Sequence, residues 1–235
     1  MRKAALDRIS RRQLCWGAAS LLASIQYSFA EALTAEAWAG RPYSYLRDYI
    51  SDLGVSACLG SADADQVCSP LAWLMNTSFV LQGLLFIAST VVLAPVLPSP
   101  TWRRTVLVLG LAHGVGTALV GFFPAVHDGL RFAGTRVHII GAYLAIAGGN
   151  LAIMAAGWGA RDLGARPWFV ALSLILGVVG TTGALLLLAW KVSFPGLLER
   201  IAADAVTVWT LTAGVLLAGA LVRRAPATMP VRQRS

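Results

Sequence analysis

The amino-acid sequence predicts an all-α membrane protein, a polytopic bundle of six transmembrane helices formed by one domain of residues 1–235. Two observations predict this fold. Hydrophobic residues make up 57% of the chain and charged residues only 13%, whereas a soluble domain carries about 25% charged residues. Apolar runs of about 20 residues, the length that crosses a bilayer as a helix, recur along the whole chain.

The apolar runs give the order and limits of the six spans. We expect them at residues 13–32, 71–96, 105–123, 137–157, 168–190 and 201–222. Tryptophan prefers the interface between membrane and water, and six tryptophans fall near the ends of these runs, at Trp16, Trp73, Trp102, Trp158, Trp168 and Trp190. The first run follows "SRRQLCW" (residues 10–16), a pattern typical of a twin-arginine export signal. We interpret this run as a membrane anchor, with a cleaved signal as the alternative.

The basic residues predict the side of the membrane that each segment occupies. The net charge is +8, and thirteen of the nineteen Lys and Arg residues fall in alternate segments that include both termini. Cytoplasmic segments carry such an excess, so we expect cytoplasmic tails at residues 1–12 and 223–235 and a long outer loop at residues 33–70. Topology thus explains the basicity, which argues against a nucleic-acid partner. Arg outnumbers Lys 17 to 2, and this bias favours a bacterial plasma membrane.

The outer loop contains two of the three cysteines, Cys58 and Cys68. The outer face of a bacterial membrane is oxidising, so we expect a disulfide between them. Two free thiols are the alternative, because spacing along the chain does not establish disulfide geometry.

The stretch "RPYSYLRDYISDLGVSAC" (residues 41–58) is too apolar to be a solvated tether. Between Tyr43 and Leu53 its large apolar side chains recur every three or four residues, which predicts a short amphipathic helix on the membrane interface. This helix would form an ordered cap over the bundle and would aim Asp48 and Asp52 toward one side. We expect either a bound cation there or an arginine from another outer loop, at Arg131, Arg136 or Arg200.

Polar residues gather in the outer segments, so we expect a ligand at the outer face. The candidate ligand-binding residues are Ser51, Asp52, His127, His138, Glu199 and Arg200. Simpler roles stay open for several of them. "SDLG" fits a helix cap or tight turn, Glu199 fits a solvated acid at a helix N-terminus, and Arg200 is one helical turn from Asp204, a spacing typical of an ion pair.

A few polar side chains fall inside the predicted spans. His113 lies near the middle of the third span, where a neutral, hydrogen-bonded imidazole is expected. Gly110 and Gly114 favour close helix packing around it, and a proton relay is the alternative role. We expect hydrogen bonds between helices from the amides of Asn76, Gln82 and Asn150.

Asp52, His127 and His138 are the candidates for a metal site. Two histidines and a carboxylate can hold a hydrolytic ion such as zinc and leave a position for water. However, the sequence has no H-x-x-x-H, H-E-x-x-H or C-x-x-C spacing, the patterns that place ligands together. We therefore predict no cofactor and keep zinc as an alternative.

Five motifs between Ile50 and Ile201 carry a family resemblance. They are "ISDLGV", "SPLAWLMNTSFVLQGLL", "GFFPAVHD", "VHIIGA" and "FPGLLERI". In this order they resemble the domain of unknown function 998 family of six-span prokaryotic membrane proteins. The resemblance implies six packed helices and no known activity, and it marks as candidates Ser51, Asp52, Gly54, Asn76, Pro124, His138, Glu199 and Arg200.

A weaker resemblance is to the membrane hydrolase superfamily that includes alkaline ceramidases. It implies a zinc ion held by three histidines beside an Asp and a Ser. The chain departs from that pattern, because it lacks a seventh span and paired histidines on a late helix.

The expected function is binding of a membrane lipid head group or small amphiphile in an outer-face polar cavity, with no enzymatic activity assigned. Asp52, His138, Glu199 and Arg200 would be its polar contacts. One alternative is a metal-dependent lipid hydrolase that uses Asp52, His127 and His138. The other is a small-molecule or proton-coupled transporter in which His113 relays protons, although carboxylates are scarce inside the spans.

Overall fold

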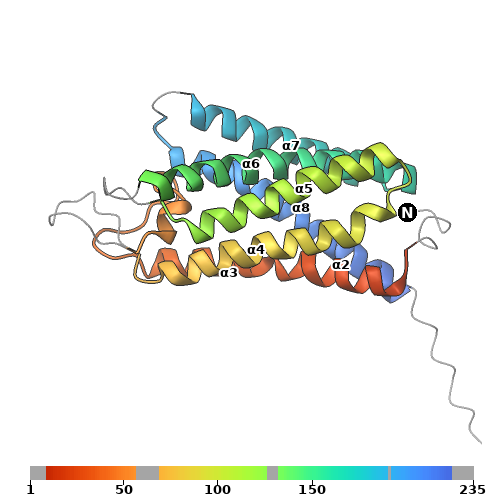
Figure 1. The fold of residues 1–235 in the computed structure, drawn as a ribbon, viewed down its shortest axis with the longest axis horizontal. Helices are drawn as coiled ribbons and strands as arrows, with labels where there is room; N and C mark the ends of the chain where they lie inside the picture. The colour runs from red at the N-terminus through yellow and green to blue at the C-terminus, as the bar shows by residue number, and fades with distance from the viewer. Residues whose placement is uncertain (1–8, 57–68, 126–131, 190–191, 224–235) are drawn as a thin grey trace, which may run out of the picture.

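The computed structural model describes residues 9–56, 69–125, 132–189 and 192–223. Every regular element within these residues is a helix (Figure 1), which confirms the all-α fold class. Five helical segments of this part of the chain are long and apolar enough to cross a membrane. They correspond to α4 (Ala72–Leu93), α5 (Pro100–Phe122), α6 (Phe132–Gly159), α7 (Pro167–Leu188) and α8 (Pro195–Arg223). The protein is therefore a multi-pass membrane protein.

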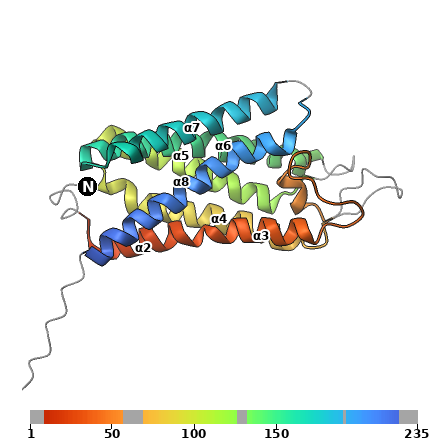
Figure 2. The same ribbon diagram turned by 180° about the vertical axis from the view of Figure 1, so that it is seen from behind.

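The predicted first span, residues 13–32, is divided into two helices. The first, α2 (Arg11–Ala23), begins after Ser10, whose side chain accepts a backbone N–H of the first turn at 3.1 Å and completes a capping box. Ser24 separates α2 from α3 (Ile25–Glu36). The two helices lie end to end along the bundle (Figure 2), and neither alone has the length of a span.

Three helices begin about five residues before the apolar runs that predicted them. The apolar run marks only the part of a helix that contacts lipid, so a helix can begin before it. Both α5 and α8 begin with a proline, which is well suited to the first position of a helix. As a consequence, Glu199 and Arg200 lie in the first two turns of α8 and not in a loop.

The helices pack side by side with α5 between α4 and α6, α7 against α6 and α8, and α2 against α4 and α8. The close approach of α4 and α5 depends on glycine. A Cβ at Gly114 would lie 2.7 Å from the carbonyl oxygen of Gly83, and a Cβ at Gly110 would lie 2.5 Å from Thr90 Oγ1. This confirms the close packing predicted for the two glycines of α5.

The two ends of the bundle differ. The first and last described residues, Ile9 and Arg223, lie at the same end, which we call the terminal end (Figure 1). The opposite end, which we call the loop end, carries the connection from α3 to α4 with its short 3-10 helix η1 (Ser51–Gly54). Two cavities lie in the bundle, one near each end.

Candidate functional site: a polar cavity beneath the cap

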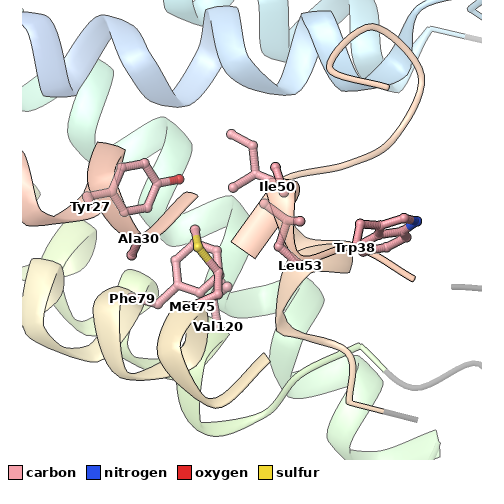
Figure 3. Close-up of a cluster of buried hydrophobic side chains, with 9 residues drawn as sticks. Tyr27, Ala30, Trp38, Ile50, Leu53, Met75, Phe79 and Val120 are labelled. Carbon is pink, nitrogen blue, oxygen red and sulfur yellow. The ribbon is translucent and has the colours of Figure 1, made fainter. Parts of the chain in front are cut away.

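Residues 43–54 form an ordered cap over the loop end, as predicted. Ile50 and Leu53 are 1% and 0% exposed, and they pack in one hydrophobic cluster with Trp38 and Met75 (Figure 3). Burial of apolar side chains is the main source of stability in such contacts. The cap is therefore held by the core of the bundle.

The helix predicted for this cap is wrong. The chain instead forms a turn at residues 45–47 and then η1. Acidic side chains take backbone donors that a helix would use: Asp48 Oδ2 accepts the N–H of Ser44 at 2.7 Å, and Asp52 Oδ2 accepts the N–H of Tyr49 at 3.2 Å. The turn interpretation of "SDLG" is confirmed, and Asp52 is engaged by the backbone of the cap.

Arg41 neutralises Asp48, where we had expected an arginine from another outer loop. Its Nη1 and Nη2 donate to the two carboxylate oxygens at 2.7 and 2.5 Å, a bidentate geometry. Burial raises the pKa of Asp48, but the hydrogen bonds from Arg41 and from the N–H of Ser44 outweigh it, so the pKa lies below its ordinary value. Asp48 is thus ionised and bound within the cap. The predicted partner Arg131 lies outside the described residues.

Arg200 pairs with a carboxylate on another helix. The side chain is 8% exposed, and its Nε donates to Glu31 Oε1 on α3 at 2.9 Å. The ion pair expected with Asp204, one turn further along α8, is therefore wrong. The actual pair connects two helices that are far apart in the sequence.

Arg200 also holds the cap onto the bundle. Its Nη1 donates to the carbonyl oxygens of Tyr45 and Asp48 at 2.9 and 3.0 Å, and its Nη2 donates to the hydroxyl of Tyr43 at 2.5 Å. Burial raises the pKa of that hydroxyl, which keeps it protonated, and it donates in turn to the carbonyl of Tyr49 at 2.9 Å. Every guanidinium nitrogen of Arg200 has a protein acceptor, so the side chain joins the cap to α3 and α8.

A cavity of about 70 Å³ lies beneath the cap, between α3, α4, α5, α6 and α8. A cavity of this size can hold several water-sized groups. Its polar lining residues are Ser51, Gln82, His113, Thr117, His138, Glu199 and Thr207. Three of the predicted ligand-binding residues thus come together here, whereas Asp52 and Arg200 do not line the cavity.

Glu199 connects the cavity to the cap. Its Oε2 accepts the backbone N–H of Ile50, and the carboxylate also has a hydrogen bond with the side chain of Ser51. These contacts fasten η1 to the first turn of α8. Glu199 is therefore a half-buried acid in the wall of the cavity, not the solvated acid of the alternative interpretation.

The two histidines of the cavity are each held by a hydrogen bond to the backbone. His113 Nδ1 lies 2.7 Å from the carbonyl oxygen of Ala145, and His138 Nδ1 lies 2.9 Å from that of Phe123. A carbonyl only accepts, so each Nδ1 carries the proton and each Nε2 of the neutral ring is an acceptor. His113 Nε2 is buried and has no hydrogen-bond partner among the described residues, and Gln82 Oε1 is in the same state.

The sequence did not mark Gln82 or His113 as ligand-binding residues. Both carried a signal, because a polar side chain inside an apolar span is costly and often functional. Glu31 carried the same signal, because it lies near the end of the first predicted span, whereas Tyr43 in the outer loop gave none. Besides Arg131, the predicted positions His127, Cys58 and Cys68 lie outside the described residues.

The proposed metal site gains no support from the described residues. No group of three His, Cys, Asp or Glu side chains among them could hold a metal ion. His138 lines the cavity and Asp52 does not. The site with His127 stays a prediction, because that residue lies outside the described part of the chain.

Residues 21–216 match one protein family, described as protein of unknown function DUF998. The chain belongs to this family. The matched segment includes every residue that lines the cavity beneath the cap, and it confirms the family resemblance found in the sequence motifs. No curated protein and no solved structure matches the chain.

Proposed function

We propose that this DUF998 family member binds the head group of a lipid or small amphiphile in the cavity beneath the cap. One observation carries this proposal: two buried acceptors, His113 Nε2 and Gln82 Oε1, have no partner among the described residues and line a cavity that also contains Glu199. A buried polar atom without a partner costs about 1–3 kcal/mol. A ligand that donates hydrogen bonds would remove this cost at both atoms.

The lining favours a head group that is cationic and carries N–H donors. Its polar atoms include a carboxylate, imidazole nitrogens that accept and an amide oxygen, and no Lys or Arg is among the described residues that line it. Apolar side chains such as Ile50, Phe79 and Val120 complete the wall and suit the hydrocarbon next to the head group. A primary ammonium fits this lining because it combines positive charge with three donors.

We further propose that α2 and α3 together form the first of six spans, in a bacterial plasma membrane. Residues 11–36 would extend about 39 Å as a helix at 1.5 Å per residue, more than the hydrocarbon thickness of about 30 Å. With cytoplasmic termini, thirteen of the nineteen Lys and Arg residues would lie inside. Alkaline phosphatase fused at Arg131 should then be active, and inactive in the loop of residues 95–102; the reverse pattern would overturn this orientation.

Short-chain phospholipids test the ligand class. We expect dihexanoyl-phosphatidylethanolamine to raise the Tm of the purified protein in detergent, because its primary ammonium donates hydrogen bonds. The choline lipid carries the charge without N–H donors, and the glycerol lipid lacks the cation, so both should have little effect. Equal Tm shifts with all three lipids would contradict the proposal.

Two variants test the site. Glu199→Gln removes the negative charge and Gln82→Leu removes an unpartnered acceptor, and each should weaken phosphatidylethanolamine binding about tenfold or more, as expected for a lost hydrogen bond to a charged group. Glu36→Gln is the matched control, because this exposed acid lies at the end of α3 at the same end of the bundle. Unchanged phosphatidylethanolamine binding in both test variants would show that the head group does not bind in this cavity.

The geometry gives less support to metal-dependent lipid hydrolysis. Asp52 accepts a hydrogen bond within the cap and does not share the cavity with His138. Hydrolysis by a metal-bound water needs these ligands around one ion.

A further inference from the structure

The second cavity, of about 400 Å³, lies at the terminal end of the bundle and shares no lining residue with the cavity beneath the cap. Its wall is mainly apolar and includes Leu21, Phe86, Ala152, Phe169, Trp209 and Leu216. Protein interiors contain few voids larger than a water molecule. This cavity is partly open at the surface of the bundle, so a ligand can enter it, and its size is that of a small-molecule site.

The polar part of this wall differs from that of the first cavity. Ser89 Oγ donates to the carbonyl of Phe86 at 2.9 Å, so this hydroxyl is satisfied within α4. None of the buried side-chain atoms without a partner in the described residues belongs to this wall. The described wall therefore has no buried side-chain atom that lacks a hydrogen bond, and the interior of the cavity fits a hydrocarbon chain.

The only charged residues among the described lining residues are Arg166 and Arg223. Arg166 directly precedes α7, and Arg223 is the last residue of α8, so both mark the terminal end of the cavity. Within the part of the chain that the structure describes, neither arginine forms an ion pair. The cavity therefore combines an apolar interior with unneutralised positive charge at one end.

We propose that this cavity binds a single-chain anionic amphiphile, a fatty carboxylate, with its chain among the helices and its head group at Arg166 and Arg223. Charge complementarity selects the anion, because a guanidinium binds a carboxylate through two parallel hydrogen bonds. The volume selects a single chain, because it lies near the lower limit of about 300–1,000 Å³ for small-molecule pockets. The site is independent of the ammonium site proposed beneath the cap.

A photoactivatable fatty acid tests this site. The protein is placed in phosphatidylcholine nanodiscs, incubated with dodecanoate that carries a diazirine near its methyl end, irradiated, and digested for mass spectrometry. We expect labelling of cavity residues such as Ala156, Leu216 and Leu217. Unlabelled dodecanoate should compete, and dodecanol and dodecylammonium should not, because they lack the anionic head group.

Variants separate the head-group contacts from general lipid exposure. Arg166→Gln and Arg223→Gln should each raise the dodecanoate concentration needed for half-maximal labelling about tenfold, as expected for loss of a charge-assisted contact. Arg104 is an exposed arginine at the same end that does not line the cavity. Arg104→Gln should therefore leave the dodecanoate concentration for half-maximal labelling unchanged. Ala156→Trp should fill the cavity and suppress labelling, with Tm measured to confirm that this variant folds.

Three results would overturn the proposal. Labelling spread equally over exposed lipid-facing residues, such as Val108 and Ile175, would show partition into the bilayer only. If dodecanol competed as strongly as dodecanoate, the arginines would not contribute to binding of the head group. Undiminished labelling in both arginine variants, or in a folded Ala156→Trp protein, would place the fatty acid elsewhere.

Discussion

Replacement of Arg200 by alanine should detach the cap from the bundle. The guanidinium pairs with Glu31 and donates to the carbonyl oxygens of Tyr45, Asp48 and Gly196. Arg200→Ala leaves the carboxylate of Glu31 buried without its partner and removes a donor from all three carbonyls. Loss of one member of a buried ion pair costs about 3–5 kcal/mol, so we expect the free energy of unfolding to fall by about this amount.

A double variant separates the cost of the buried, unpaired charge from the cost of the lost hydrogen bonds to the cap. Glu31→Leu with Arg200→Met removes both charges and keeps apolar volume at both positions. Replacement of a complete buried pair by apolar residues is often neutral or stabilising, so the double variant should recover about 2 kcal/mol or more relative to Arg200→Ala. The cap carbonyls still lack their donor, and full recovery is not expected.

Two measurements check this expectation. Equilibrium unfolding in mixed detergent gives the free energy, and hydrogen exchange of residues 43–54 reports whether the cap is open. Arg47→Ala, an exposed arginine of the same cap, is the control and should change the free energy by less than about 0.5 kcal/mol. If Arg200→Ala costs less than about 1 kcal/mol and leaves the cap protected, the pair does not hold the cap and the argument is refuted.

Three further predictions concern the cap and the rest of the connection from α3 to α4. Because the pKa of Asp48 lies below its ordinary value, its pairing stabilises the fold above the unfolded-state pKa of about 3.9 and is lost as the pH falls through the folded-state pKa. The protection factors of the cap amides, which correct for the pH dependence of intrinsic exchange, should therefore fall below about pH 4, and Asp48→Asn should remove this dependence. Asp52→Ala should lower the Tm more than Asp63→Ala or Asp65→Ala in the same connection, since Asp52 accepts the backbone N–H of Tyr49 in the cap and the other two belong to the polar sequence "GSADADQ"; equal Tm values would contradict this. Cys58 and Cys68 should resist thiol labelling until reductant is added, and free labelling of both in protein kept oxidised would exclude the disulfide.

The sequence predicted the helices well because the membrane imposes a length and an apolar composition on each span. Of the three amides expected to form interhelical hydrogen bonds, Asn150 is confirmed, because its Nδ2 donates to the carbonyl of Ala202 on α8 at 2.9 Å. Asn76 Nδ2 instead donates to the carbonyl of Gly54 in η1 at 2.8 Å, and Gln82 Oε1 has no partner among the described residues. The sequence misplaced the start of α8, because the apolar run stops before Arg200 and Glu199, whereas the helix continues to Pro195. Apolar runs report contact with lipid, and a helix can extend beyond it.

The candidate site could be predicted only in part. Ser51, His138 and Glu199 were found because polar residues stand out in an apolar chain, and they do line one cavity. The partner of Arg200 was missed because helical spacing points to a local carboxylate, Asp204, whereas the tertiary fold supplies Glu31. Helical spacing describes neighbours on one helix and contains no information on which helices pack together.

The ion pair between Glu31 and Arg200 has a consequence for biosynthesis. A chain is made from its amino terminus, so Glu31 on α3 is synthesised well before Arg200 on α8, and four α-helices, α4 to α7, lie between them in the sequence. Until α8 has joined the bundle, this carboxylate lacks Arg200 as its counterion, and the cap lacks the hydrogen bonds that Arg200 donates to it. Addition of α8 therefore completes the structure: a chain truncated before α8 would leave the carboxylate of Glu31 without its counterion and the cap less firmly held.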